Sequence, residues 1–313
     1  MTRLAYILAT DTYATIRPVI ERLRRQTIRQ QIELVLVAPA RSAVEDVFAH
    51  QAEFAAITFV ENPVEELAEA RAAGIRSASA ETVFIGETHS YPHPELAERL
   101  LAARAGGFSC VAPGMRNANP GSARSWAGFL SDYGPWSASL PAGEVDRFPL
   151  YNALFDRTAL MALGGRLVPA LSHGDELQIL LEDAGHRTYF EPGAQLEHVN
   201  VAPAGHWVRE RYLSGLLIAH HRALRWTLAR RYFYALCSPA IPLVLIWRVL
   251  PGVRAAIGRE RVPAGTLPLV VVGFFVKGWG ELLGYLGWPT ERAERGMHEY
   301  EVHKLSYGGA KGR

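Results

Sequence analysis

The sequence predicts an α/β fold in which a mostly parallel sheet carries helices on both faces, followed by a C-terminal helical region. Short apolar runs alternate with helical patterns throughout the first half of the chain. Parallel strands need a crossover between them, usually a helix, so this alternation indicates a parallel sheet. Two long apolar stretches near the C-terminus lie outside the alternation. We therefore expect one domain over residues 1–226 and a helical region over residues 227–313.

Each element follows from its local pattern. Residues 32–38 (IELVLVA) form a continuous apolar run, which is typical of a strand covered on both faces. Ile16, Ile20 and Leu23 recur at helical spacing and predict a helix. The same reasoning gives strands at residues 4–9, 56–60, 82–86, 111–113 and 188–191, and helices at residues 15–26, 65–79, 94–105, 157–163, 176–184 and 205–231.

Residues 117–147 interrupt the alternation. Gly, Pro, Ser and Trp dominate this segment, which predicts a long surface excursion over a pocket. Trp126, Tyr133 and Trp136 lie within it and have two interpretations. They stack on a sugar, or they form local core.

Composition limits the class of protein. With 49% hydrophobic residues, the 313-residue chain can bury a core and is not disordered. Only two cysteines, Cys110 and Cys237, exclude a disulfide-based scaffold and fit a reducing compartment. No basic and apolar leader opens the sequence, so we expect no cleaved secretion signal.

The net charge of +2 hides an uneven distribution. Residues 199–261 contain ten arginines and two acids, a local charge of +8, which leaves −6 for the rest. Arginines beside apolar segments predict an anionic membrane surface as a partner. Nucleic acid is not expected as a partner, because the same stretch is rich in Leu, Ile, Val and Trp.

The C-terminal region contains two uncharged stretches, residues 232–247 and 262–276. They are 16 and 15 residues long, short of the roughly 20 that a spanning helix needs. The second reaches that length only by taking Lys277 and Glu281 into the bilayer, where charges are costly. Spanning helices, a re-entrant hairpin, an interfacial anchor and a buried helix pair of a soluble domain all stay open.

The loop after residues 82–86 is the first candidate site. Ligands of an open α/β sheet bind beyond the carboxyl ends of its strands. Here Glu87 and His89 lie two residues apart, so a carboxylate and an imidazole can bind one divalent cation, Mn²⁺ or Mg²⁺. The alternative is a polar turn that ends at Pro92 and Pro94 before a helix.

The order of these elements resembles that of family 2 glycosyltransferases of the GT-A fold. Their fourth strand ends in an Asp-x-Asp pair that holds a metal and a diphosphate, followed by Pro-x-Pro and a helix. The segment TVFIGETHSYPHPEL (residues 82–96) keeps the Pro-x-Pro, with Glu87 and His89 at the acidic positions. It resembles a subgroup with a Glu-x-His variant of the motif. The resemblance covers residues 4–226 and implies a GT-A sheet that binds a nucleotide-sugar.

The resemblance also assigns roles along the first half of the chain. Arg71, in the Ala-Arg-Ala-Ala-Gly-Ile segment at 70–75, would lie near the diphosphate; the alternative is a solvated helix arginine. Asp11 would meet the base or ribose, or else cap the next helix. Asn152 would fix a donor hydroxyl or the acceptor.

Residues 174–200 resemble the region that carries the catalytic base. Asp175 is the expected base, with Glu176 as the neighbouring candidate; the alternative is a helix cap and a solvated acid. His198 ends a P-x-A-x-x-x-H run at 192–198. The resemblance implies that it meets the metal or the diphosphate together with Glu87 and His89.

Two functions follow from this frame. The first is an inverting glycosyltransferase on the cytoplasmic side of the cell membrane, which moves a sugar from a nucleotide-sugar donor to a lipid-linked or polysaccharide acceptor. The second is a non-catalytic descendant of the fold that binds a nucleotide-sugar or a partner enzyme at the membrane. The sequence lacks a P-loop, a Gly-x-Gly-x-x-Gly after the first strand, a Cys-x-x-Cys pair and a Gly-x-Ser-x-Gly elbow.

Overall fold

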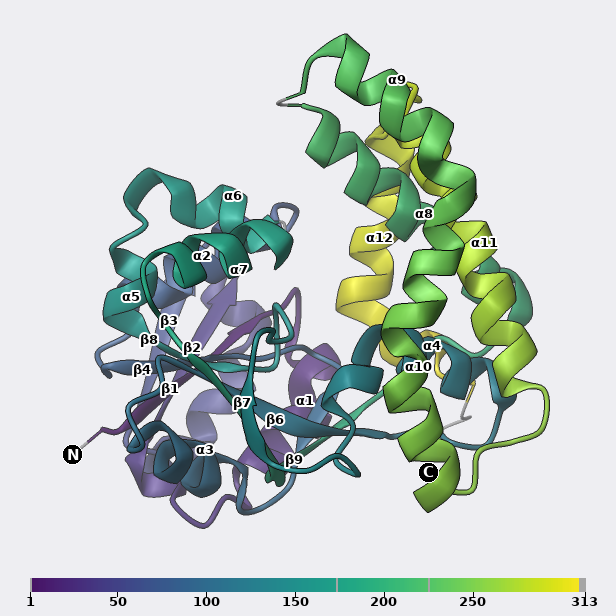
Figure 1. Ribbon diagram of the computed structural model, residues 1–313. Coiled ribbons are helices and arrows are strands. Elements are labelled where there is room, and N and C mark those ends of the chain that lie inside the picture. Colours follow the sequence, from purple (N-terminus) through teal and green to yellow (C-terminus); the bar gives the residue numbers. More distant parts are fainter. Residues whose placement is uncertain (1, 173, 225, 310–313) are drawn as a thin grey trace. The chain divides into compact units, whose positions relative to one another are not determined.

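The structure is a computed structural model that describes residues 2–309, apart from His173 and Arg225. The chain forms two compact units (Figure 1). The first comprises Met1–Arg116 and Ala138–Glu197, and the second comprises Asn117–Ser137 and His198–Arg313. The sequence analysis expects a functional boundary at residue 226. The division into two compact units does not test that boundary, which stays a prediction.

The first unit is built on a nine-stranded sheet. Its strand order is β3-β2-β1-β4-β8-β6-β9-β5, and β7 pairs with β9. β1 pairs in parallel with β2 and with β4, and β2 pairs in parallel with β3, which confirms the expected parallel arrangement. The strands are β1 (Leu4–Ala9), β2 (Ile32–Ala38), β3 (Ala56–Glu61), β4 (Thr82–Ile85), β5 (Ser90–Pro92), β6 (Cys110–Asn117), β7 (Gly143–Val145), β8 (Leu154–Asp156) and β9 (Thr188–His198).

Beyond β4 the sheet becomes mixed. β8 lies antiparallel between β4 and β6. A strand of three residues is too short to give a periodic pattern, and the sequence analysis did not predict it. Its position brings the residues just before it, including Asn152, beside the carboxyl end of β4.

Helices cover both faces of this sheet, as expected (Figure 1). α1 (Tyr13–Leu23) and α3 (Leu96–Arg104) lie on one face, and α2 (Leu67–Ser77), α6 (Leu167–Ser172) and α7 (Gly174–Asp183) lie on the other. α5 (Arg157–Met161) directly follows β8. Every residue of β1 and β2 is buried, because both faces of these strands are covered.

The sequence analysis predicted a surface excursion over residues 117–147. This prediction is wrong for the first part of the segment, which forms helix α4 (Ala123–Tyr133). The Ser122 hydroxyl accepts the Ser125 N–H at 3.1 Å and caps the helix. Trp126 and Phe129 are buried and meet edge to face at 5.7 Å. Gly, Pro and Ser residues cluster on either side of this helix, so its helical periodicity was not recognised in the sequence. Trp126 is therefore local core.

The second unit is helical. α4 packs against α8 (Ala204–Ala223), α10 (Ile241–Arg259) and α11 (Thr266–Tyr285), and the unit also contains α9 (Leu228–Cys237) and α12 (Glu291–His303). The single helix expected over residues 205–231 is two helices, because the Thr227 hydroxyl accepts the Arg230 N–H and starts α9 anew. α11 extends the second apolar stretch past Lys277 and Glu281.

α8 and α11 pack backbone against backbone. A Cβ added at Gly215 would collide with the carbonyl of Lys277, one at Gly280 with that of Tyr212, and one at Gly284 with that of Leu216. Only glycine permits this approach, which is the reason for small residues at close helix contacts.

A buried arginine ties α4 to α8. The Arg211 guanidinium donates to both carboxylate oxygens of Asp132, at 2.7 and 2.6 Å, and to Glu210 at 2.9 Å. Bidentate pairs of this kind are strong and directional. Burial alone would raise the pKa of Asp132, but the adjacent Arg211 charge holds this pKa below its ordinary value.

Two helical runs in the second unit are long and apolar enough to cross a membrane by length and composition. They are Leu228–Arg259 and Thr266–Tyr285, and within the apolar 18-residue window of each run 22% and 39% of the residues, respectively, are buried. Length and composition alone are weak evidence that a helix crosses a membrane, since helices of other kinds meet the same criterion.

The glycine contacts make a testable prediction. Gly280→Ala should destabilise the second unit by about 1–3 kcal/mol, because a methyl group there overlaps the Tyr212 backbone. Gly258 in α10 has nothing within 4 Å of its added Cβ, so Gly258→Ala should instead stabilise the helix by roughly 0.5–1 kcal/mol. Thermal unfolding followed by circular dichroism separates the two. Equal and small effects would mean that α8 and α11 are not in close contact.

Candidate functional site

The loop after β4 is buried and closely packed. Glu87, Thr88, His89 and Ser90 are each no more than 4% exposed. Gly86 donates its N–H to the carbonyl of Ile7 at 2.9 Å, and a Cβ at Gly86 would overlap the Tyr6 ring. The start of the loop therefore continues the pairing of β4 with β1, and the Tyr6 ring fills the space that a side chain at residue 86 would need.

Glu87 is held by donors on both sides. Its Oε2 accepts the Ser90 hydroxyl at 3.0 Å and the Asn152 side-chain amide. The His89 Nε2 lies 3.5 Å from the same oxygen. A carboxylate withdrawn from water needs such partners. The sequence analysis grouped Glu87 with His89, and the structure places them together.

Asn152 reaches Glu87 from a strained backbone. Its φ is +61°, and among the described residues it is the only non-glycine with positive φ. Asparagine tolerates this left-handed region better than most residues. Its N–H donates to the Ile85 carbonyl at 2.7 Å, and its amide also donates to Ser90. Strain of this kind is typical of functional positions.

His198 is the last residue of β9, and the boundary between the two units falls at this residue. Its Nδ1 lies 3.0 Å from the Asn200 Oδ1, while the Asn200 amide nitrogen donates to Asn117 and to the His198 carbonyl. Asn200 therefore offers an acceptor to Nδ1. This contact fixes the tautomer in which Nε2 carries the lone pair. The Tyr133 ring packs on the imidazole at 4.5 Å.

Glu87, His89 and His198 form a candidate metal-binding cluster. One possible ligand atom from each lies within 4.8 Å of the others, and all three side chains are buried. One carboxylate oxygen and two imidazoles suit a divalent transition ion. Mg²⁺ prefers an all-oxygen shell, so of the two expected ions the donor set fits Mn²⁺ better. Zn²⁺ and Fe²⁺ also accept these donors.

Arg71 offers a second, cationic feature of the first unit. Its side chain is buried, its Nε has no hydrogen-bond partner, and no acid among the described residues pairs with it. Its guanidinium stacks on the Tyr151 ring at 3.5 Å, and the Tyr151 hydroxyl donates to the Leu171 carbonyl at 2.7 Å. A buried guanidinium held by an aromatic ring and lacking a carboxylate is suited to an anionic ligand.

The other candidate residues are less constrained. Asp11 accepts from the Thr12 N–H at 2.8 Å and from the Thr15 hydroxyl at 2.7 Å, so it stabilises the turn before α1. Asp175 is exposed and Glu176 half-buried in the first turn of α7. The roles expected for these three acids stay predictions.

The sequence analysis missed Tyr6 and Tyr151. Tyr6 is buried in β1, and its hydroxyl has no hydrogen-bond partner among the residues that the structure describes. Burial, and to a smaller extent the charge of Glu87, raises the pKa of Tyr6 well above its ordinary value, so the hydroxyl stays protonated and is a donor. A tyrosine in an apolar strand gives no signal in the sequence; Tyr151 was visible only as a neighbour of Asn152.

Comparison with known proteins confirms the fold. No family model and no curated protein matches the sequence. A solved structure similar to this chain is the mannosyltransferase PcManGT from Pyrobaculum calidifontis in complex with GDP-Man and Mn²⁺. It is 18% identical, with a TM-score of 0.55 over 90% of this chain and 87% of that one. At this identity the likeness concerns the GT-A fold alone.

Two further structures are more distant. S. aureus TarS 1-349 in complex with UDP is 11% identical, with a TM-score of 0.47 over 90% of each chain. GalNAc-T7 with UDP, GalNAc and Mn²⁺ is 13% identical, with a TM-score of 0.49 over 63% of this chain and 43% of that one.

Metal binding can be tested without turnover. We expect the protein to bind Mn²⁺, measured by loss of the free-ion electron paramagnetic resonance signal. Glu87→Gln should weaken binding by about a hundredfold or more, and Asn200→Ala, which loosens His198, by roughly tenfold. His186→Gln is the matched control, because His186 is a histidine of the first unit paired with Ser109. Equal affinity of Glu87→Gln and His186→Gln would contradict the assignment.

The backbone of Asn152 makes a separate prediction. Asn152→Ala and Asn152→Gly both remove the hydrogen bond to Glu87, but only alanine also bears the cost of the left-handed backbone. The alanine variant should therefore be less stable than the glycine variant by about 1–2 kcal/mol. Chemical denaturation measures the difference, and equal stabilities would show that the residue is not held at positive φ.

Proposed function

We propose that this protein is a metal-assisted, inverting glycosyltransferase that uses a nucleotide-sugar donor. The observation that carries the proposal is the convergence of Glu87, His89 and His198, buried at the ends of strands β4 and β9 of a GT-A sheet. Ligands of such sheets bind beyond the carboxyl ends of the strands. The similar mannosyltransferase from Pyrobaculum calidifontis was solved with GDP-Man and Mn²⁺, which supports both the donor class and the metal.

The charged groups fit a departing diphosphate. Glu87, His89 and His198 would hold the divalent ion, which supplies positive charge to the leaving group. Arg71, stacked on Tyr151 and without a carboxylate partner in the part of the chain that the structure describes, would bind the phosphates on the same unit. Asn152, which donates its side-chain amide to Glu87, would orient this carboxylate.

The acceptor needs a base. In inverting transfer, the acceptor hydroxyl attacks the anomeric carbon, the bond to the diphosphate breaks, and the hydroxyl proton passes to a carboxylate. We assign this role to Asp175, with Glu176 as its neighbour. Both lie in the first turn of α7, where the helix dipole favours the ionised form. Asp11 would contact the nucleoside.

We place the reaction at the cytoplasmic face of the cell membrane, with a lipid-linked or polysaccharide acceptor. The support is the composition of the second unit, which combines apolar helices with an excess of arginine. Anionic lipids are concentrated on the cytoplasmic leaflet and attract such segments.

Turnover tests the proposal. The purified chain is incubated with UDP-, GDP- and dTDP-sugars, with and without Mn²⁺, and release of the nucleoside diphosphate is measured. We expect metal-dependent release from at least one donor, and at least a hundredfold loss in Glu87→Gln. Asp175→Asn should lower the rate about a hundredfold or more while nucleotide affinity is kept. Asp183→Asn, an exposed acid at the far end of α7, is the control.

The result also distinguishes the second candidate function. Tight nucleotide binding with no turnover of any donor would favour a non-catalytic nucleotide-sugar-binding protein. Equal rates for Asp175→Asn and Asp183→Asn would remove Asp175 as the base.

A further inference from the structure

Most of the exposed large apolar side chains of the protein belong to the second unit. Of the 20 exposed ones among the described residues, all but Met161 and Ile179 belong to this unit. A soluble protein rarely leaves so many apolar groups exposed on one unit, and such groups mark contact surfaces.

These side chains follow helical stripes. Leu228, Tyr232 and Leu236 recur every four residues on α9 and are exposed, whereas Ala235 is buried and belongs to a core cluster against which Tyr234 also packs. On α11 the exposed stripe is Leu267, Val271, Phe275 and Trp279. Each helix therefore has one covered face and one apolar face without a protein partner among the described residues.

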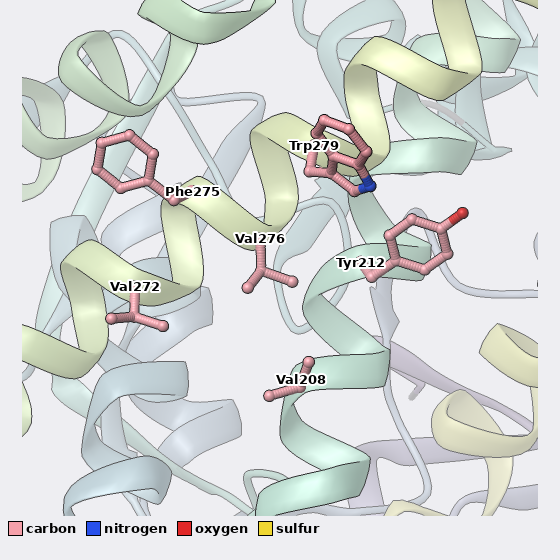
Figure 2. A pocket seen from close by; sticks show the side chains of 6 residues that line it. All are labelled: Val208, Tyr212, Val272, Phe275, Val276 and Trp279. Carbon is pink, nitrogen blue, oxygen red and sulfur yellow. The ribbon is translucent and has the colours of Figure 1, made fainter.

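A groove runs along this surface. Val208 and Tyr212 of α8 lie opposite Val276 and Trp279 of α11, with Val272 and Phe275 completing the lining (Figure 2). Its volume is about 650 Å³. Because its lining includes Phe275 and Trp279 of the α11 stripe, the groove is continuous with that apolar face.

Positive charge accompanies the apolar surface. A smaller hollow on α10, of about 280 Å³, is lined by Trp247, Leu250 and Pro251 together with Arg248 and Arg254. Arg230, Arg259 and Arg261 are also exposed on or beside α9 and α10, against the single acid Glu260. Tryptophan and arginine around an apolar surface match the boundary between acyl chains and anionic headgroups.

The packing of α8 argues against a spanning arrangement. α8 runs alongside α11 in the same direction, with Gly273 against Trp207, Gly280 against Tyr212 and Gly284 against Leu216. If α11 crossed the bilayer, this length of α8 would cross with it. That length contains Arg209, Glu210 and Arg211, and charges in hydrocarbon are costly. The buried Glu281 of α11 faces Arg222 of α8 at 3.8 Å, inside the unit.

We propose that the second unit lies in the plane of an anionic membrane and does not cross it. The exposed faces of α9, α10 and α11 enter the headgroup and acyl boundary, and Arg248 and Arg254 bind lipid phosphate. This inference specifies how the protein binds the membrane, and it rests on the membrane location given under the proposed function.

Vesicle binding by the full chain tests the inference. We expect flotation with phosphatidylcholine vesicles that contain phosphatidylglycerol, weaker flotation with phosphatidylcholine alone, and release of the bound protein by alkaline carbonate. Arg248→Gln with Arg254→Gln should weaken binding to anionic vesicles about thirtyfold, and Phe275→Ser with Trp279→Ser should weaken it roughly tenfold or more. Circular dichroism confirms that each variant is folded.

Matched controls lie on the first unit. Met161→Ser with Ile179→Ser, and Arg17→Gln with Arg41→Gln, remove exposed groups of the same kinds and should leave binding unchanged. Retention of the protein after carbonate treatment, or equal losses in variants and controls, would overturn the inference. Because no sugar donor is present, loss of vesicle binding leaves the transfer reaction standing, and absence of turnover leaves the membrane inference standing.

Discussion

The hydrogen bond from Asn152 to Glu87 is the contact on which the candidate site depends. It joins two loops that are 65 residues apart in the sequence. Asn152 is fixed by its own N–H on the β4 carbonyl, and Tyr151 beside it carries Arg71 on its ring. One short segment before β8 thus positions both the carboxylate and the guanidinium. A buried carboxylate without such a donor would be strongly disfavoured.

The parts of the fold that the sequence predicts are those in which one pattern repeats over many residues. β1 and β2 are continuous apolar runs, and their bounds are as expected. β8 has three residues, too few to repeat a pattern, and α4 was not recognised because the residues on either side of it are rich in Gly, Pro and Ser. The break between α8 and α9 depends on the cap of Thr227, a local hydrogen bond that competes with an uninterrupted helical period.

In the candidate site, too, some residues could be predicted from the sequence and others could not. The resemblance to family 2 glycosyltransferases implied the grouping of Glu87, His89 and His198, and the structure brings one possible ligand atom of each within 4.8 Å of the others. Tyr6 could not be predicted as part of the site, because a tyrosine in a buried strand cannot be told from the apolar residues around it. Asn200 could not be predicted either. Its role is to accept a hydrogen bond from the His198 ring, and this contact is visible only in the folded structure.

Neither unit is a continuous stretch of chain. The boundaries at residues 116, 137 and 197 interleave them, so that α4 is made before the helices that cover it. During synthesis on the ribosome, the apolar side of α4 has no cover until α8, α10 and α11 have emerged. No single cut in the polypeptide yields either unit whole. Loss of the C-terminal helices would leave the apolar side of α4 uncovered, so the second unit needs both of its chain segments.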